Sequence, residues 1–106
     1  MPKIGDRVGA ILCTNDEEGV LELLGFGTYE GEEFPETAVG FMAELVIEAG
    51  HKNPKIKLDN GDVVWGCECW WGSEEKIRRS LEGWNVKEVR IADARKAILE
   101  EEKDNA

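Results

Sequence analysis

Three cysteines and one histidine are the residues of this chain best suited to metal chemistry. Cys67 and Cys69 lie two residues apart, and Cys13 and His51 would complete a Cys3His set of the kind that holds structural zinc. Cysteines at i and i+2 of a regular strand have Cβ atoms about 6–7 Å apart, whereas sulfurs that share a zinc ion lie about 3.8 Å apart. Zinc therefore requires a break in the strand, and we favour the alternative that these cysteines pack as small apolar residues.

Four tryptophans, Trp65, Trp70, Trp71 and Trp84, lie within a stretch of twenty residues. Strand alternation places Trp65 and Trp71 in the core and Trp70 on the opposite face, beside Glu68. Trp70 is then either covered by a second layer of structure, such as the last helix, or exposed. An exposed indole would serve as a stacking platform or an interface anchor, and the sequence leaves both alternatives open.

The stretch 55–71 predicts the hairpin that positions these side chains. Asn60-Gly61 favours a two-residue type I′ turn, which pairs Asp59 with Asp62. The resulting core face comprises Ile56, Leu58, Val63, Trp65, Cys67, Cys69 and Trp71. The opposite face comprises Lys55, Lys57, Val64, Gly66, Glu68 and Trp70, where Gly66 leaves a notch that we expect to bind any small ligand.

The remaining sequence predicts one domain over residues 1–106. Residues 4–29 form a hairpin bent at Gly25 and Gly27, and residues 30–36 form an acidic loop. Residues 37–49 form a helix, with a strand as the alternative. A helix over 74–83, capped by Ser73, precedes a strand over 86–91 and a helix over 92–103. The expected fold is α+β: a bent, mainly antiparallel sheet of about five strands, such as an SH3-like partial barrel, with about three helices.

Charge and composition limit the function classes. The chain has a net charge of −10, and residues 16–36 contain eight acidic residues and no basic one. Such a surface repels duplex nucleic acid and attracts basic proteins. No run of about 18 apolar residues predicts a membrane span. An odd number of cysteines and no apolar leader indicate a cytoplasmic protein. With one histidine and no phosphate loop or nucleophile elbow, we expect neither an enzyme nor a cofactor.

The motif Trp-Gly-Cys-Glu-Cys-Trp-Trp-Gly at 65–72, with Gly-Asp-Arg-Val-Gly-Ala-Ile-Leu at 5–12 and Leu-Leu-Gly-Phe-Gly-Thr-Tyr-Glu-Gly at 23–31, resembles small uncharacterised phage and prophage proteins. The resemblance covers most of the chain and implies a setting in the host cytoplasm. Short acidic phage proteins commonly act by occupying a host protein surface or a signalling molecule.

Two function classes follow as hypotheses. The first is a non-enzymatic anti-defence protein that sequesters a nucleotide-like signal, with Trp70 stacking on a base. Its phosphate would meet Lys55, Lys57, Arg78 and Arg79, and Glu68 or Asn53 would recognise a polar edge beside Gly66. The second is an acidic inhibitor or nucleic-acid mimic that blocks a basic host protein through Glu30, Glu32, Glu33 and Glu36. A homo-oligomer suits either class, and a zinc-stabilised module is a third alternative.

Overall fold

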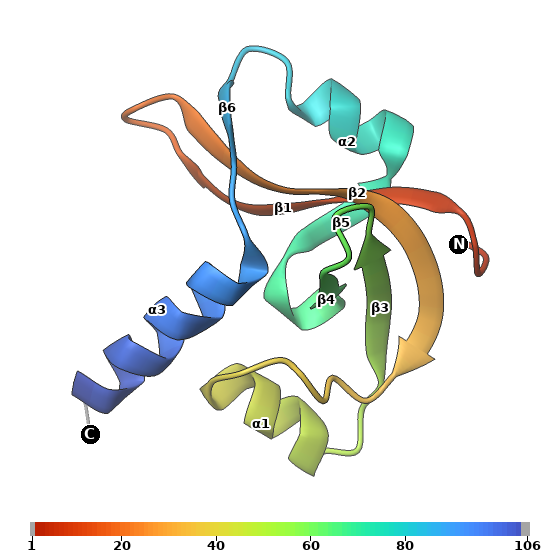
Figure 1. Cartoon of the computed structure of the whole chain (residues 1–106), viewed down its shortest axis with the longest axis vertical. Helices are drawn as coiled ribbons and strands as arrows, with labels where there is room; N and C mark the ends of the chain where they lie inside the picture. Colours follow the sequence, from red (N-terminus) through yellow and green to blue (C-terminus); the bar gives the residue numbers. More distant parts are fainter. Residues whose placement is uncertain (1, 105–106) are drawn as a thin grey trace.

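The computed structural model describes residues 2–104, which form six strands, three α-helices and one 3₁₀ turn (Figure 1). In chain order these are β1 (Arg7–Asn15), β2 (Val20–Glu33), α1 (Phe41–Glu48), β3 (Asn53–Leu58), β4 (Val63–Trp65), η1 (Gly66–Glu68), β5 (Trp70–Ser73), α2 (Glu74–Ser80), β6 (Asn85–Glu88) and α3 (Ile91–Asp104). The predicted α+β class is confirmed. In this part of the chain, no helix combines the length and apolar character needed to cross a membrane.

One open sheet organises the molecule. Five strands pair antiparallel in the order β4-β3-β2-β1-β5, and β6 adds to the start of β2 in parallel orientation. The turn η1 carries the chain from β4, at one end of this order, to β5 at the other. The sheet is open, because β4 and β5 do not pair with each other. The SH3-like partial barrel stays a prediction.

The bend in β2 depends on two glycines, as predicted. Leu23 pairs with Ile11 and Gly25 with Ala10, so Leu24 is an extra residue and Gly25 has a φ of 136°. A Cβ on Gly27 would lie 2.0 Å from the carbonyl oxygen of Lys57, so β3 approaches too closely for any side chain there. The bulge and the close approach let β2 curve around the sheet (Figure 1).

The prediction of an acidic loop over 30–36 is wrong for residues 30–33, because these four residues continue β2. Tyr29 pairs with Ile56 and Glu32 with Pro54, and the extra residue between these pairs is accommodated where Gly31 has a φ of 96°. A bulge lets a strand keep its pairing through a glycine, so β2 extends to Glu33.

The central hairpin differs from the predicted one by one residue in register. Lys57 pairs with Val63 and Ile56 with Val64, because the loop contains Asp59 as well as Asn60 and Gly61. Gly61 alone in this loop has a positive φ, 93°, so the turn is type I with a glycine bulge rather than type I′. Val64, predicted to face outward, therefore lies in the core. Trp65 is buried, as predicted, but it belongs to neither of the two apolar clusters described below.

The predicted strand through 71 breaks after Trp65. The carboxylate of Glu68 accepts a hydrogen bond from the backbone N–H of Trp65 at 3.1 Å, which closes the 3₁₀ turn η1. The chain then crosses to β1, where Trp70 pairs with Ile11 and Trp71 with Ala10. Cys67 and Cys69 consequently leave the predicted alternation and are half-buried.

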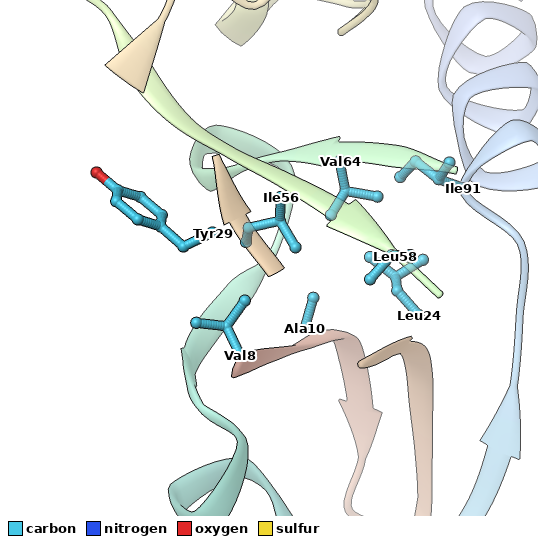
Figure 2. Close-up of a cluster of buried hydrophobic side chains, with 8 residues drawn as sticks. All are labelled: Val8, Ala10, Leu24, Tyr29, Ile56, Leu58, Val64 and Ile91. Atoms are coloured by element: carbon cyan, nitrogen blue, oxygen red, sulfur yellow. The ribbon is translucent and has the colours of Figure 1, made fainter. Parts of the chain in front are cut away.

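Two apolar clusters hold the sheet and helices together. Figure 2 shows the larger one, which gathers side chains from β1, β2, β3, β4 and the first residue of α3. Its buried members are Val8, Ala10, Leu24, Tyr29, Ile56, Leu58, Val64 and Ile91. The smaller cluster, Ile11, Leu21, Leu23 and Ile77, packs α2 against β1 and β2. The main core therefore lies inside the curve of the sheet.

The helices match the predicted order with different ends. α1 begins after Gly40, whose φ is 98°, and the expected cap Thr37 instead accepts a hydrogen bond from the indole N–H of Trp65. Ser73 caps α2 as predicted, because its hydroxyl accepts the backbone N–H of Lys76 at 3.2 Å. α3 begins at Ile91, the last residue of the predicted strand.

Candidate functional site: a tryptophan-lined groove

Strand β5 directs two neighbouring tryptophans to opposite sides of the sheet. Trp71 faces inward and stacks on Tyr29, with ring centroids 5.5 Å apart and planes 4° from parallel. Trp70 is 81% exposed. Of the two alternatives for Trp70, an exposed indole is therefore the one observed.

Beside Trp70 lies a groove of about 650 Å3 between β1, β5 and α2, which we call the tryptophan groove. Ser73 begins α2 next to β5, so the helix presents Lys76 and Ser80 to this groove one turn apart. Its lining comprises Ile11, Thr14, Leu21, Gly66, Cys69, Trp70, Trp71, Lys76, Ile77, Ser80 and Trp84. Three of the four tryptophans thus surround one hollow of the size that small ligands occupy.

Among residues 2–104, Lys76 is the only charged residue that lines the tryptophan groove, although the whole chain has a net charge of −10. No ion pair involves Lys76 within residues 2–104, and its aliphatic stem lies over Gly72. A single ammonium group in an apolar hollow without a carboxylate attracts an anion.

Gly66 lines the tryptophan groove at a position too crowded for a side chain. A Cβ on Gly66 would lie 2.7 Å from Cδ of Pro54 and 3.3 Å from Nε1 of Trp71. Gly66 thus lies beside Trp71 and Cys69 at the groove rather than between a lysine and Glu68, and a ligand-binding notch at this residue stays a prediction.

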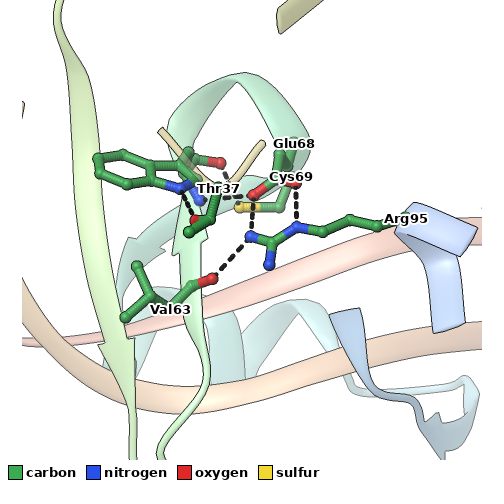
Figure 3. A network of polar contacts seen from close by, with 6 residues as sticks. Thr37, Val63, Glu68, Cys69 and Arg95 are labelled. Carbon is green, nitrogen blue, oxygen red and sulfur yellow. Dashed lines mark hydrogen bonds and ion pairs between the residues drawn. The ribbon is translucent and has the colours of Figure 1, made fainter. Parts of the chain in front are cut away.

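The structure does not place Glu68 where the predicted ligand site requires it, because the Glu68 carboxylate pairs with Arg95. Figure 3 shows both oxygens of Glu68 paired with the guanidinium of Arg95, at 2.9 Å each, while Arg95 also donates to the carbonyl oxygen of Val63. The Glu68 side chain is only 9% exposed and the Arg95 side chain 17%. Glu68 thus fixes α3 to η1 and does not face the tryptophan groove.

The predicted phosphate contacts on β3 lie away from Trp70, because the register differs and the strand breaks. Lys55 pairs with Glu33 at 3.4 Å, and its ammonium lies 5.9 Å from the ring centre of Trp65. Asn53 pairs with Glu33 in the sheet, and Lys57 is exposed on β3. None of these three lines the tryptophan groove.

The two arginines predicted to bind phosphate have other partners. The guanidinium of Arg78 lies 4.2 Å above the ring centre of Phe26 and donates to Glu74 at 2.9 Å. Arg79 lies 3.9 Å from Glu75. Neither arginine lines the tryptophan groove, where Lys76 is the charged residue that the described part of the chain supplies.

The four proposed zinc ligands are not brought together. Within residues 2–104, no group of three or more His, Cys, Asp or Glu side chains is placed to hold a metal ion. Burial, followed by the nearby charges of Glu68 and Cys67, raises the pKa of Cys69 to about 12. The Cys13 thiol donates a hydrogen bond to Glu22 at 2.8 Å, which raises its pKa to about 11. These thiols are poor ligands and nucleophiles near neutral pH.

The four glutamates proposed to bind a basic protein do not form one free acidic surface. Glu30 is half-buried on β2, and Glu33 pairs with Lys55. Glu32 and Glu36 are exposed. The structure therefore gives this acidic segment fewer free carboxylates than a charged loop would have.

The sequence prediction missed Lys76, Ser80 and Trp84 as groove residues. Lys76 and Ser80 lie four residues apart on α2, and this spacing was a usable signal because side chains at i and i+4 share a helix face. Trp84 lies beyond the end of α2 and had no such signal. Thr14 and Cys69 had no such signal, since β1 and β5 meet only through tertiary pairing.

No protein-family model, no curated protein and no solved structure matches this chain. The functional assignment therefore depends on the geometry of the tryptophan groove.

Proposed function

We propose that this protein binds a small planar aromatic molecule that carries one anionic group, and that a nucleoside monophosphate is the simplest ligand of this class. The observation that carries the proposal is the position of the exposed Trp70 indole on the same groove as Lys76. The indole offers a stacking surface, and the ammonium group offers one charge-assisted hydrogen bond.

The shape and polarity of the tryptophan groove support this ligand class. A hollow of about 650 Å3 lies in the range of small-molecule sites, and its apolar lining includes Trp71 and Trp84. Thr14 and Ser80 supply neutral hydroxyl groups that suit the polar edge of a base or a ribose. The single cation favours one phosphate over a di- or triphosphate.

Sequestration of a nucleotide signal by a phage-type protein is the biological setting that we propose for this binding. The setting rests on the resemblance of the 65–72 motif to phage and prophage proteins, and on the lack of a recognisable catalytic motif in the sequence. The protein would then act by lowering the free concentration of its ligand, with no chemical step.

Isothermal titration calorimetry with AMP and with adenosine tests whether Lys76 binds the phosphate group of the ligand. Lys76→Gln should weaken AMP binding about tenfold or more, because a hydrogen bond to a charged group is lost. The same variant should leave adenosine binding unchanged, since adenosine has no phosphate. Lys57→Gln, an exposed lysine outside the groove, is the matched control. An equal loss for both ligands, or no loss for AMP, would contradict the assignment of Lys76.

A further inference from the structure

Exposed apolar side chains concentrate on two helices far from the tryptophans in sequence. Ten large hydrophobic side chains are exposed in residues 2–104, and six of them lie on α1 and α3. The six are Phe41, Met42, Leu45, Ile47, Ile98 and Leu99. Three of them, Phe41, Met42 and Ile98, line one groove, and we call these three the α1–α3 face. Phe41 is 63% exposed and Met42 66%, so the face is not covered by the rest of the chain. Such a concentration on one face marks an interaction surface.

The two helices enclose a preformed apolar groove of about 300 Å3. Phe41, Met42 and Ile98 line it, and Leu12 and Ala94 belong to the same lining. The backbone N–H of Phe41 donates to the carboxylate of Glu102 at 2.6 Å, which ties the start of α1 to the end of α3. Figure 1 shows that these parts of α1 and α3 lie near one another, outside the sheet. The groove shares no lining residue with the tryptophan groove.

The charges around this groove are predominantly negative. α1 carries Glu44 and Glu48 and no basic residue. The C-terminal half of α3 carries three consecutive glutamates, Glu100, Glu101 and Glu102. α3 also carries three basic residues, Arg95, Lys96 and Lys103, of which Arg95 pairs with Glu68. An apolar groove bordered by carboxylates therefore needs a partner that is both apolar and basic.

We propose that the α1–α3 face binds an amphipathic helix with a basic polar side, supplied by a partner protein. The apolar side of such a helix would contact Phe41, Met42 and Ile98, and its lysines or arginines would face the glutamates. A second copy of this chain fits less well, because it would place the same carboxylates against one another in a protein of net charge −10.

Fluorescence anisotropy with a labelled synthetic peptide tests this proposal. The probe is an amphipathic peptide of Leu, Lys and Ala about 14 residues long, which as a helix spans ~21 Å, the length of α3. It should bind the wild type and weaken steeply as salt rises. A peptide with Glu in place of Lys should not bind. If the basic peptide does not bind, or both peptides bind alike, the proposal is overturned.

Variants of exposed residues locate the contact without disturbing the core. Phe41→Ser combined with Met42→Ser should weaken the peptide about tenfold or more, and it keeps the backbone N–H that reaches Glu102. Glu44→Gln with Glu48→Gln should also weaken it, whereas Glu32→Gln with Glu36→Gln on the other acidic segment should not. Trp70→Ala should bind the peptide normally, which separates this face from the proposed ligand groove. Equal affinity for all these variants would refute the assignment of the face.

Analytical ultracentrifugation separates the peptide partner from a second copy. The wild type should sediment as a monomer at micromolar concentration. A dimer that dissociates in the Phe41→Ser, Met42→Ser variant would overturn the proposal and assign the face to self-association.

Discussion

Arg95 on α3 and Glu68 in η1 form a bidentate ion pair, with both hydrogen bonds 2.9 Å long and the two residues 27 positions apart in the sequence. The pair explains two features of the fold at once. It holds α3 against the sheet, and it orients the carboxylate that closes the 3₁₀ turn through the backbone N–H of Trp65. Because η1 redirects the chain to β5, the pair also determines where Trp70 lies.

Loss of Arg95 should therefore destabilise the protein strongly. Arg95→Met leaves the nearly buried carboxylate of Glu68 without its partner and should lower the free energy of unfolding by about 3–5 kcal/mol. Urea unfolding measures this change. Arg79→Met removes an exposed arginine 3.9 Å from Glu75 and should change stability by less than about 1 kcal/mol. Similar losses for the two variants would show that the Arg95–Glu68 pair has no special role.

The close approach of β3 to Gly27 gives a second stability prediction. Gly27→Ala would place a methyl group 2.0 Å from the carbonyl oxygen of Lys57, so the strands must separate, at a cost of about 3 kcal/mol or more. Gly72→Ala is the matched control on β5, because the nearest atom to its Cβ would be Cδ of Lys76 at 3.6 Å. Thermal unfolding of both variants measures the difference. Equal melting temperatures would contradict the strand spacing described for β2 and β3.

The hydrogen bond from Cys13 to Glu22 predicts that the Cys13 thiol reacts slowly with alkylating reagents and that the rate depends on pH. The pKa of Cys13 is raised to about 11, mainly by this hydrogen bond. The thiolate fraction is therefore small at pH 8 and increases as the pH rises toward 11. Glu22→Gln removes the acceptor charge, lowers the pKa and should speed iodoacetamide alkylation at pH 8 about tenfold or more. Mass mapping of the alkylated cysteine measures this rate. Unchanged alkylation of Cys13 in the variant would rule out the carboxylate as the cause.

Local sequence signals predicted the elements that depend on local chemistry. Ser73 indicated the start of α2 because its hydroxyl caps the helix, and Gly25 and Gly27 indicated the bend because each occupies a position that other residues fit poorly. The fold class followed from these elements and their order.

The register and the strand break depend on contacts distant in sequence. Asn60-Gly61 fits a type I turn with a glycine bulge as well as a type I′ turn, and burial of Val64 favours the former. The break after Trp65 depends on Glu68 and Arg95, which no local pattern connects. Of the residues predicted to bind a ligand, Trp70 and Gly66 therefore line the tryptophan groove, whereas Lys55, whose position follows from the register, does not.

The most direct measurement of the central claim is the affinity of AMP, GMP, CMP and UMP for the wild type and for Trp70→Ala by isothermal titration calorimetry. Trp70 is exposed, so its removal should leave the fold intact. Loss of base stacking should weaken the bound nucleotide by about 5- to 150-fold, while Phe41→Ala, an exposed aromatic residue on α1, should bind it like the wild type. Binding that Trp70→Ala leaves unchanged, or the failure of all four nucleotides to bind the wild type, would contradict the account.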